Sequence, residues 1–272
     1  MSNNLLRIIT AVVGIPLVLG LTYVGGWPFT ILVLVIALLA QFELYQLLEA
    51  TGLRPDKPLG LFLGGLMVVQ VIYPPALPAA LALFIVAIAI SPLGGVGKDS
   101  GSLPATVFGV VYPTFLLAHL LEIRLGRGPT VADFDAFVLT VVLFLIGWAT
   151  DTFAYYVGRS MGRRPLAPAV SPKKTWEGAI GGTVGAVLVG VLLKVTILPF
   201  MSWVHVLVLT LIVAVVGQLG DLAESKMKRA AGVKDSGKLL PGHGGMLDRF
   251  DALILAAPAA YLYLRYVAGI IQ

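Results

Sequence analysis

The stretch DAFVLTVVLFLIGWATDTFAYYVGR, residues 135–159, is an apolar run long enough to cross a lipid bilayer that ends in polar residues. Roughly 20 consecutive apolar residues span the hydrocarbon core as an α-helix. Asp151 lies inside this run, where insertion of an acidic side chain costs about 2.5 to 3.5 kcal/mol, so the residue needs a polar cavity or a partner. The stretch therefore predicts a membrane-spanning helix with one end in a polar chamber.

Composition extends this interpretation to the whole chain. Its 272 residues are 58% hydrophobic and only 12% charged, with a mean hydropathy of +0.95. The absence of cysteine excludes disulfides, thiolate nucleophiles and iron-sulfur clusters, and three histidines leave little for a zinc site. Chemistry through a hard metal ion with oxygen ligands remains open. The first apolar run has no small-residue cleavage pattern, so we expect a retained span rather than a signal peptide.

Hydropathy and the placing of Gly and Pro predict an all-α polytopic membrane protein with about nine transmembrane helices. The expected spans are residues 5–24, 28–48, 59–74, 77–92, 103–122, 135–157, 177–200, 203–223 and 250–270. The third and fourth are short enough to form one broken hairpin instead. We divide the chain into residues 1–134, with about five amino-terminal helices, and residues 135–272, which carry two basic loops.

The distribution of Lys and Arg sets the expected orientation. With the amino terminus in the cytoplasm, 15 of the 19 Lys and Arg fall on that side, including those of segments 159–174 and 226–249. The net charge of +5 is then concentrated in two cytoplasmic loops, which favours an anionic cytosolic ligand or anionic lipid headgroups. No strip of aromatic and basic residues suits base stacking, so we expect no nucleic-acid partner.

Acidic residues gather at the ends of the later apolar runs. Asp221 and Glu224 are three residues apart, as are Asp248 and Asp251, so each pair shares a face if its segment is helical. Carboxylates presented together repel one another unless a cation lies between them, and oxygen-only ligands favour Mg²⁺ or a similar hard ion. For Asp248 alone, an ion pair with Arg249 that caps the helix is a competing interpretation.

Two segments carry groups suited to an anion. In PGHGG, residues 241–245, backbone N–H groups are open to a polyphosphate. The basic residues near it are Lys226, Lys228, Arg229, Lys234 and Lys238. In SPKKTWE, residues 171–177, Lys173 and Lys174 precede Thr175, which we expect to cap a helix. A tight turn and positive-inside anchoring are the simpler alternatives for the two segments. Asp151 and Glu177 are expected to tie the spans together or to position these lysines.

Small residues recur every four positions in the seventh expected span, at Gly178, Gly182, Ala186 and Gly190. Such a stripe is typical of close helix packing rather than nucleotide binding. It is compatible with packing inside one chain or across a homodimer.

Two classes of protein place carboxylates inside a membrane: a cation-coupled transporter, and an enzyme that joins a lipid to a soluble phosphorylated donor. Transporters of many folds show matching broken helices in two sequence halves, which this chain does not. The two basic segments favour the enzyme.

The run SKMKRAAGVKDSGKLLPGHGGMLDRFD, residues 225–251, resembles the signature of the phosphatidate cytidylyltransferases, the CDP-diacylglycerol synthases. WATDTFAYYVGR, SPKKTWEGAIGG and GDLAESKMKR are similar to further segments of that family, so the resemblance covers residues 148–251. It implies transfer of CMP from CTP to phosphatidate, with Mg²⁺, at the cytoplasmic face of the cell (inner) membrane. A CTP-dependent polyprenol kinase is the alternative enzyme, but its hydroxyl nucleophile needs a base and the signature fits it poorly.

The resemblance also implies roles for residues within the catalytic region 135–272. Asp221 and Asp248 are expected to bind the catalytic Mg²⁺, supported by Glu224 and Asp251, with room for a second cation. Lys173 and Arg229 are expected to stabilise phosphate charge during the reaction. The expected substrate-binding residues are Lys174, Lys228, Lys234, Gly242, His243, Gly244, Gly245 and Arg249. A phosphatidate oxygen is already anionic at neutral pH, so its attack on CTP needs charge neutralisation more than a strong base.

Overall fold

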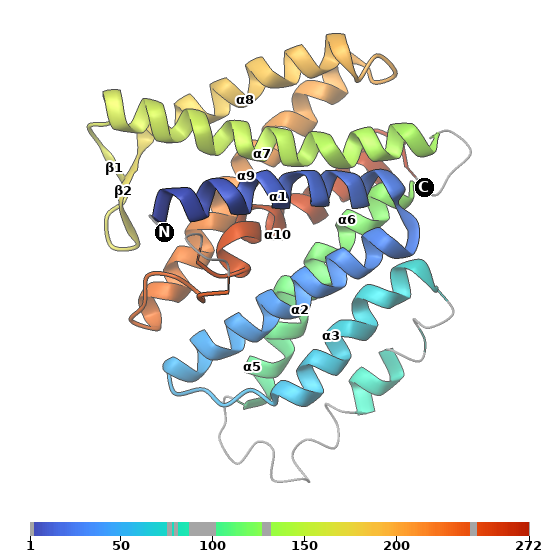
Figure 1. Ribbon diagram of the computed structural model, residues 1–272, viewed down its shortest axis with the longest axis vertical. Helices are drawn as coiled ribbons and strands as arrows, with labels where there is room; N and C mark the ends of the chain where they lie inside the picture. The colour runs from blue at the N-terminus through green and yellow to red at the C-terminus, as the bar shows by residue number, and fades with distance from the viewer. Residues whose placement is uncertain are drawn as a thin grey trace. The chain divides into compact units, whose positions relative to one another are not determined.

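The computed structural model describes residues 3–74, 78, 81–86, 102–126, 132–239 and 244–271, and helices dominate them (Figure 1). The first part of the chain forms α1 (Asn3–Val24), α2 (Gly26–Ala50), α3 (Lys57–Ile72), α5 (Ser102–Gly109), the π-helix η1 (Val110–Phe115) and α6 (Leu116–Leu125). Where α1 gives way to α2, Gly25 and Gly26 have φ angles of 67° and 49°, a backbone conformation that residues other than glycine rarely adopt. Asp56 caps the amino-terminal end of α3, because its side chain accepts a hydrogen bond from Leu59 N at 3.1 Å.

The second part contains the longest helices and a small hairpin. Its elements are α7 (Asp133–Met161), β1 (Pro165–Ala167), β2 (Ser171–Thr175), α8 (Trp176–Thr196), α9 (Trp203–Ala230), α10 (Leu247–Leu262) and the π-helix η2 (Tyr263–Val267). The strands pair antiparallel, with Pro165 opposite Thr175 and Ala167 opposite Ser171. We expected a loop over 171–175. A three-residue β1 is too short to show the alternation of side chains that identifies a strand in a sequence.

The chain folds as two compact units, each assembled from separate stretches of sequence. One comprises Met1–Leu121 with Met227–Phe250, and the other comprises Glu122–Lys226 with Asp251–Gln272. The contiguous division at residue 134 stays a prediction.

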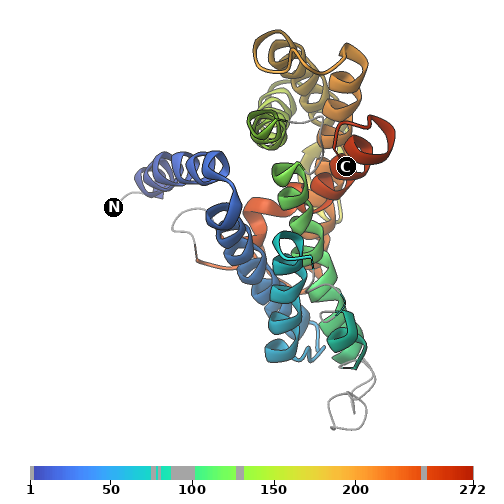
Figure 2. The same ribbon diagram turned by 90° about the vertical axis from the view of Figure 1, so that its right-hand side faces the viewer.

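In the first unit, α2 packs against α3 and the segment from α5 to η1 (Figure 2). A polar network lies inside this packing. The Tyr45 hydroxyl donates to Thr106 O at 2.8 Å, and Gln41 Nε2 donates to the Tyr45 oxygen and to Gly60 O, each at 2.8 Å. Buried polar groups require such partners. The network ties three helical segments together next to the apolar core of Leu63, Met67 and Val110.

In the second unit, α7 and α8 lie side by side along much of their length (Figure 1). The glycine stripe makes this possible. A Cβ at Gly178 would lie 2.9 Å from Ala154 O, and one at Gly182 would lie 2.8 Å from Thr150 O. Gly190 faces Thr210 of α9. The stripe is therefore a helix-packing face, as predicted, and these glycines pack within one chain.

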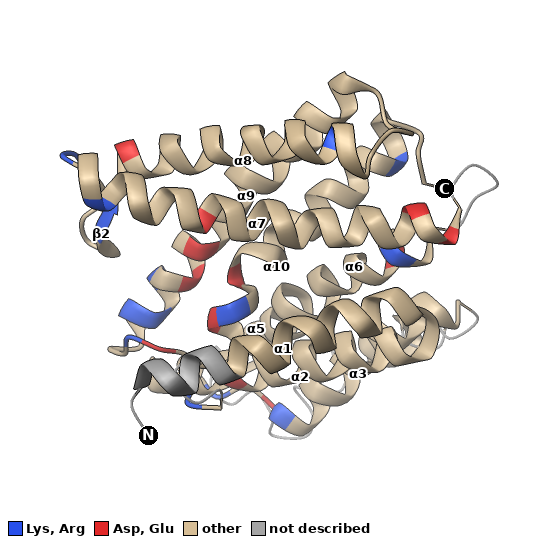
Figure 3. Cartoon of the chain, turned by 45° about the horizontal axis from the view of Figure 1, so that its top comes forward, with Lys and Arg blue, Asp and Glu red and all other residues tan. Residues whose placement is uncertain are grey.

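The described residues are consistent with the expected α-helical membrane protein, with the β1–β2 hairpin as their only sheet. Six helical segments among them are long and apolar enough to cross a bilayer: Gly26–Ala50, Ser102–Leu125, Asp133–Met161, Trp176–Thr196, Trp203–Ala230 and Leu247–Val267. Two further apolar helices are shorter, Thr10–Val24 and Lys57–Ile72. The expected span 77–92 lies largely outside the described residues, so a count of nine stays a prediction. Charged residues are rare along α7 and α8 and occur mainly near their ends (Figure 3).

Candidate active site

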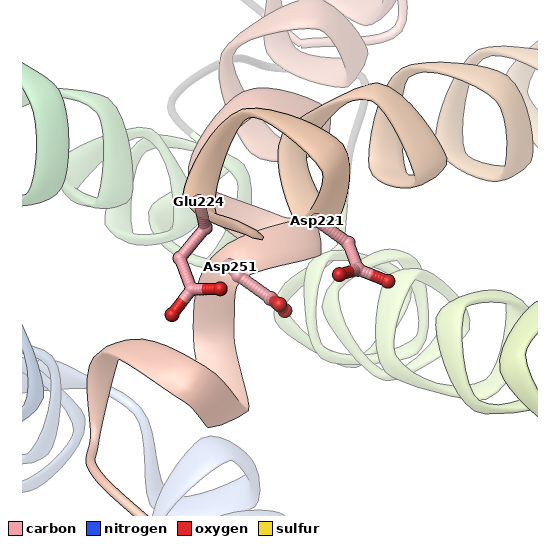
Figure 4. Close-up of side chains that lie close together, drawn as sticks. All are labelled: Asp221, Glu224 and Asp251. Atoms are coloured by element: carbon pink, nitrogen blue, oxygen red, sulfur yellow. The ribbon is translucent and has the colours of Figure 1, made fainter. Parts of the chain in front are cut away.

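Three carboxylates converge in the second unit. Asp221 and Glu224 lie on α9 and Asp251 lies on α10, and one oxygen of each falls within 4.8 Å of the others. Figure 4 shows the Asp251 carboxylate between those of Glu224 and Asp221. Glu224 has no exposed surface. The three-residue spacing on α9 turns Asp221 and Glu224 to one side, as the sequence predicted.

This carboxylate cluster has the donor set of a hard-cation site. Its ligands are all oxygen, which suits Mg²⁺ or Ca²⁺ rather than a soft metal. Oxygens bound to one Mg²⁺ at about 2.1 Å lie no more than about 4.2 Å apart, whereas the larger radius of Ca²⁺ allows about 5 Å. Three oxygens that lie within 4.8 Å of one another are therefore close enough to share one such cation after at most small side-chain rotations. The residues fit a divalent cation.

A pocket of about 550 Å³ adjoins the carboxylate cluster within the same unit. Asp151, Lys173, Lys174, Gln218 and Asp221 contribute its polar lining. Lys174 forms an ion pair with Asp221. The predicted phosphate-binding lysines and one carboxylate of the cluster therefore line the same pocket. Gln218 also lines it and was not predicted.

The β1–β2 hairpin and the start of α8 fix the lysines at this pocket. Lys173 and Lys174 lie on β2, which continues directly into α8. Thr175 caps α8, as predicted, since its Oγ1 accepts a hydrogen bond from Gly178 N at 3.1 Å. Glu177 Oε2 accepts from the backbone N of Arg163 at 3.0 Å and of Arg164 at 3.2 Å. Glu177 thus ties the first turn of α8 to the segment after α7, as we expected.

Asp248 lies in the first turn of α10, in the other unit. Its carboxylate accepts hydrogen bonds from Lys228 Nζ at 2.7 Å, Ser236 N at 2.9 Å and Gly245 N at 2.8 Å. The side chains of Asp248 and Lys228 are only 4% and 11% exposed. This buried ion pair joins α9 to α10. A role for Asp248 as a metal ligand stays a prediction.

The other predicted residues of this region have varied surroundings. Arg229 Nη1 donates to Val233 O at 2.7 Å, next to the end of α9. Lys234 and Arg249 are exposed. Gly244 has a φ of 84°, and a Cβ there would lie 2.7 Å from Asp248 Oδ2, so glycine is required for conformation and space. Gly242 and His243 lie outside the described residues.

One residue with buried contacts to this region was missed. Glu43 of α2 accepts hydrogen bonds from Ser236 Oγ, Met246 N and Leu247 N. The signal was present, because Glu43 is an acidic residue inside the expected span 28–48, and such residues in apolar spans usually have a functional partner.

The fold and the site together define a class: an integral membrane protein with a lysine-lined pocket beside a carboxylate cluster. The chain belongs to the cytidylyltransferase family, whose family model matches residues 5–267.

Curated relatives agree with this assignment. The chain is 41% identical over 265 residues to the phosphatidate cytidylyltransferase of Brucella abortus (strain 2308), covering 97% of this chain and 94% of the relative. It is 34% identical over 274 residues to the enzyme of that name from Bacillus subtilis (strain 168), covering 95% of this chain and 96% of the relative. The corresponding protein of Thermotoga maritima is 35% identical over 279 residues, with 98% of each chain covered.

Proposed function

We propose that this protein transfers CMP from CTP to phosphatidate, giving CDP-diacylglycerol and pyrophosphate for phospholipid synthesis. The observation that carries the proposal is the pocket that brings Lys173 and Lys174 beside Asp221 of the carboxylate cluster. The names of the relatives fit the same reaction. They lend no support to a polyprenol kinase or a transporter.

The lysines answer the main electrostatic difficulty of this reaction. A lipid phosphate must approach a triphosphate, so several negative charges are brought together. Lys173 and Lys174 would bind phosphate oxygens in the pocket, and an entering anion would compete with Asp221 for Lys174. A phosphatidate oxygen then attacks the α-phosphorus of CTP, a new P–O bond forms, and the bond to pyrophosphate breaks. The attacking oxygen carries no proton, so the pocket needs no general base.

Asp221, Glu224 and Asp251 would hold the divalent cation. When bound, Mg²⁺ would neutralise charge on the triphosphate and on the departing pyrophosphate. Asp248 remains a proposed further ligand, and the donor set leaves room for a second cation.

Lys228, Arg229, Lys234 and Arg249 remain proposed phosphate-binding residues, with the backbone at Gly242, His243, Gly244 and Gly245. Lys228 follows Glu224 by four residues on α9, and Asp248 precedes Asp251 by three on α10. Residues with these spacings share a helix face. Homodimerisation stays a separate proposal.

The proposed reaction is tested with purified full-length protein in detergent, labelled CTP, phosphatidate and Mg²⁺. We expect lipid-linked CMP and pyrophosphate in equal amounts. Formation of CDP with a phosphorylated lipid would instead identify a kinase, and no product with either a phosphatidate or a polyprenol acceptor would refute the enzymatic proposal.

In the same assay, Lys173→Ala should lower kcat/KM, because an ammonium group that offsets phosphate charge is lost. The fall should correspond to a loss of about 2 to 4 kcal/mol of transition-state stabilisation. Lys173 is exposed and its side chain has no hydrogen bond or ion pair among the residues that the structure describes, so membrane insertion should be normal. Arg159→Ala, which removes another basic residue of the pocket lining, is the comparison. Wild-type activity of Lys173→Ala, with an altered orientation in the membrane, would reduce Lys173 to a topological anchor.

We further propose about nine spans in the cell inner membrane, with a cytoplasmic amino terminus, an external carboxyl terminus and an active site that faces the cytoplasm. The support is the charge distribution, with basic residues concentrated in 159–174 and 226–249. Single cysteines introduced into this cysteine-free chain at Ser160 and at Gln272 provide the test. In intact cells, an impermeant thiol reagent should label only Gln272→Cys, and labelling of Ser160→Cys would reverse the orientation.

A further inference from the structure

Glu43 is a buried acidic residue in an apolar helix. It lies on α2 and is 5% exposed. Its carboxylate accepts hydrogen bonds from Ser236 Oγ at 2.9 Å, Met246 N at 2.9 Å and Leu247 N at 2.8 Å. Burial of a carboxylate is costly unless such bonds replace its hydration. Three short, charge-assisted bonds offset that cost and give the residue a defined task.

The donors lie within the connection between α9 and α10 and at the first residue of α10, about two hundred residues further along the chain. Met246 and Leu247 lie where α10 begins, and the first amides of a helix have no partners within it. A carboxylate is favourable there because it also interacts with the positive end of the helix dipole. Glu43 therefore takes the place of a local capping residue, and it does so from a distant helix.

Two glycines let the backbone reach Glu43. A Cβ at Gly237 would lie 2.5 Å from Glu43 Oε1, and a Cβ at Gly245 would collide with Ser236 Oγ and Glu43 Oε2. Gly245 was expected to admit a phosphate to the backbone. In the structure, its missing side chain makes room for this carboxylate and hydroxyl.

The bonds of Glu43 interlock with those of Asp248. Ser236 donates its hydroxyl to Glu43 and its backbone N–H to Asp248. Along the next turn, Gly245 N donates to Asp248 while Met246 N and Leu247 N donate to Glu43. A shift at Glu43 must therefore move the backbone that orients the Asp248–Lys228 ion pair.

We infer that Glu43 is a positioning residue for the reaction: it fixes the α9–α10 connection at Ser236 and at the start of α10, and thereby the geometry of Asp248 and Lys228. The inference rests on the proposed function for the importance of that pair. It also gives the amino-terminal helices a direct part in organising the catalytic signature.

Glu43→Gln is the primary test. Its neutral amide directs N–H groups toward backbone donors and cannot accept all three bonds, while its size and burial are preserved. We expect kcat per folded enzyme to fall about 10- to 100-fold with a smaller change in KM for CTP. Trypsin should cleave faster after the exposed Lys234 and Lys238. Glu49→Gln, the same change at a partly exposed position of α2, should alter neither readout.

A double-mutant cycle separates positioning from general destabilisation. Ser236→Ala should reduce kcat in the wild-type background but much less in the Glu43→Gln background, because the hydroxyl acts through the carboxylate. Wild-type kcat and unchanged tryptic cleavage in folded Glu43→Gln would overturn the inference while leaving the proposed reaction intact. Equal losses from Ser236→Ala in both backgrounds would also overturn it. Absence of lipid-linked CMP from the wild-type enzyme would instead refute the proposed function, whereas faster tryptic cleavage does not depend on activity.

Discussion

Asp221→Asn should reduce turnover by about 100- to 1000-fold, the loss expected when one strong electrostatic contribution to a transition state is removed. Asp221 belongs to the carboxylate cluster and also pairs with Lys174 in the lysine-lined pocket. The amide keeps the size of the side chain but loses the charge that would hold a cation and orient the lysine. Folding should be little affected, because the side chain is partly exposed.

Turnover over a range of Mg²⁺ concentrations provides the measurement. Asp221→Asn should require more Mg²⁺ for half-maximal rate, whereas Asp135→Asn, the same change at a partly exposed position in the first turn of α7, should not. The double variant with Asp251→Asn should be scarcely worse than either single variant, because both carboxylates belong to one cluster. Normal turnover with normal Mg²⁺ dependence in Asp221→Asn would show that the cluster has a structural role only.

Asp248→Asn should cause the largest loss of stability, about 3 to 5 kcal/mol, because it removes one charge of the buried ion pair that Asp248 forms with Lys228. The same variant should lose activity, since Asp248 and Lys228 are both proposed contributors to the site. The midpoint of thermal unfolding in detergent and the specific activity of the folded fraction measure the two effects separately.

Adding Lys228→Met to Asp248→Asn removes the second charge of the buried pair as well, so it should recover much of the lost stability without recovering activity. Comparing the single variant with the double variant therefore separates a structural role of the ion pair from a functional one. Recovery of both stability and turnover in the double variant would confine Asp248 and Lys228 to a structural role. Unchanged stability in Asp248→Asn would contradict the buried ion pair itself.

The sequence predicted the features that act within one segment. Hydropathy alone identified the apolar helices, because a backbone in lipid must satisfy its hydrogen bonds internally. The three-residue spacing of Asp221 and Glu224 placed them on one face of α9, and Thr175 was recognised as the cap of α8. Residues 225–251 carried the family resemblance. Each of these signals depends on neighbours a few positions away.

Only the tertiary structure decided which side chains meet. It brought Asp251 to Asp221 and Glu224, and it showed that Gly178 and Gly182 face α7 of the same chain. It also paired Asp248 with Lys228 on another helix, where the sequence had offered the adjacent Arg249. Glu43 shows the physical reason most clearly. Nothing near it in the sequence reveals that its carboxylate accepts a hydrogen bond from the backbone N–H of Leu247, 204 residues away. Helix packing and loop closure determine that contact.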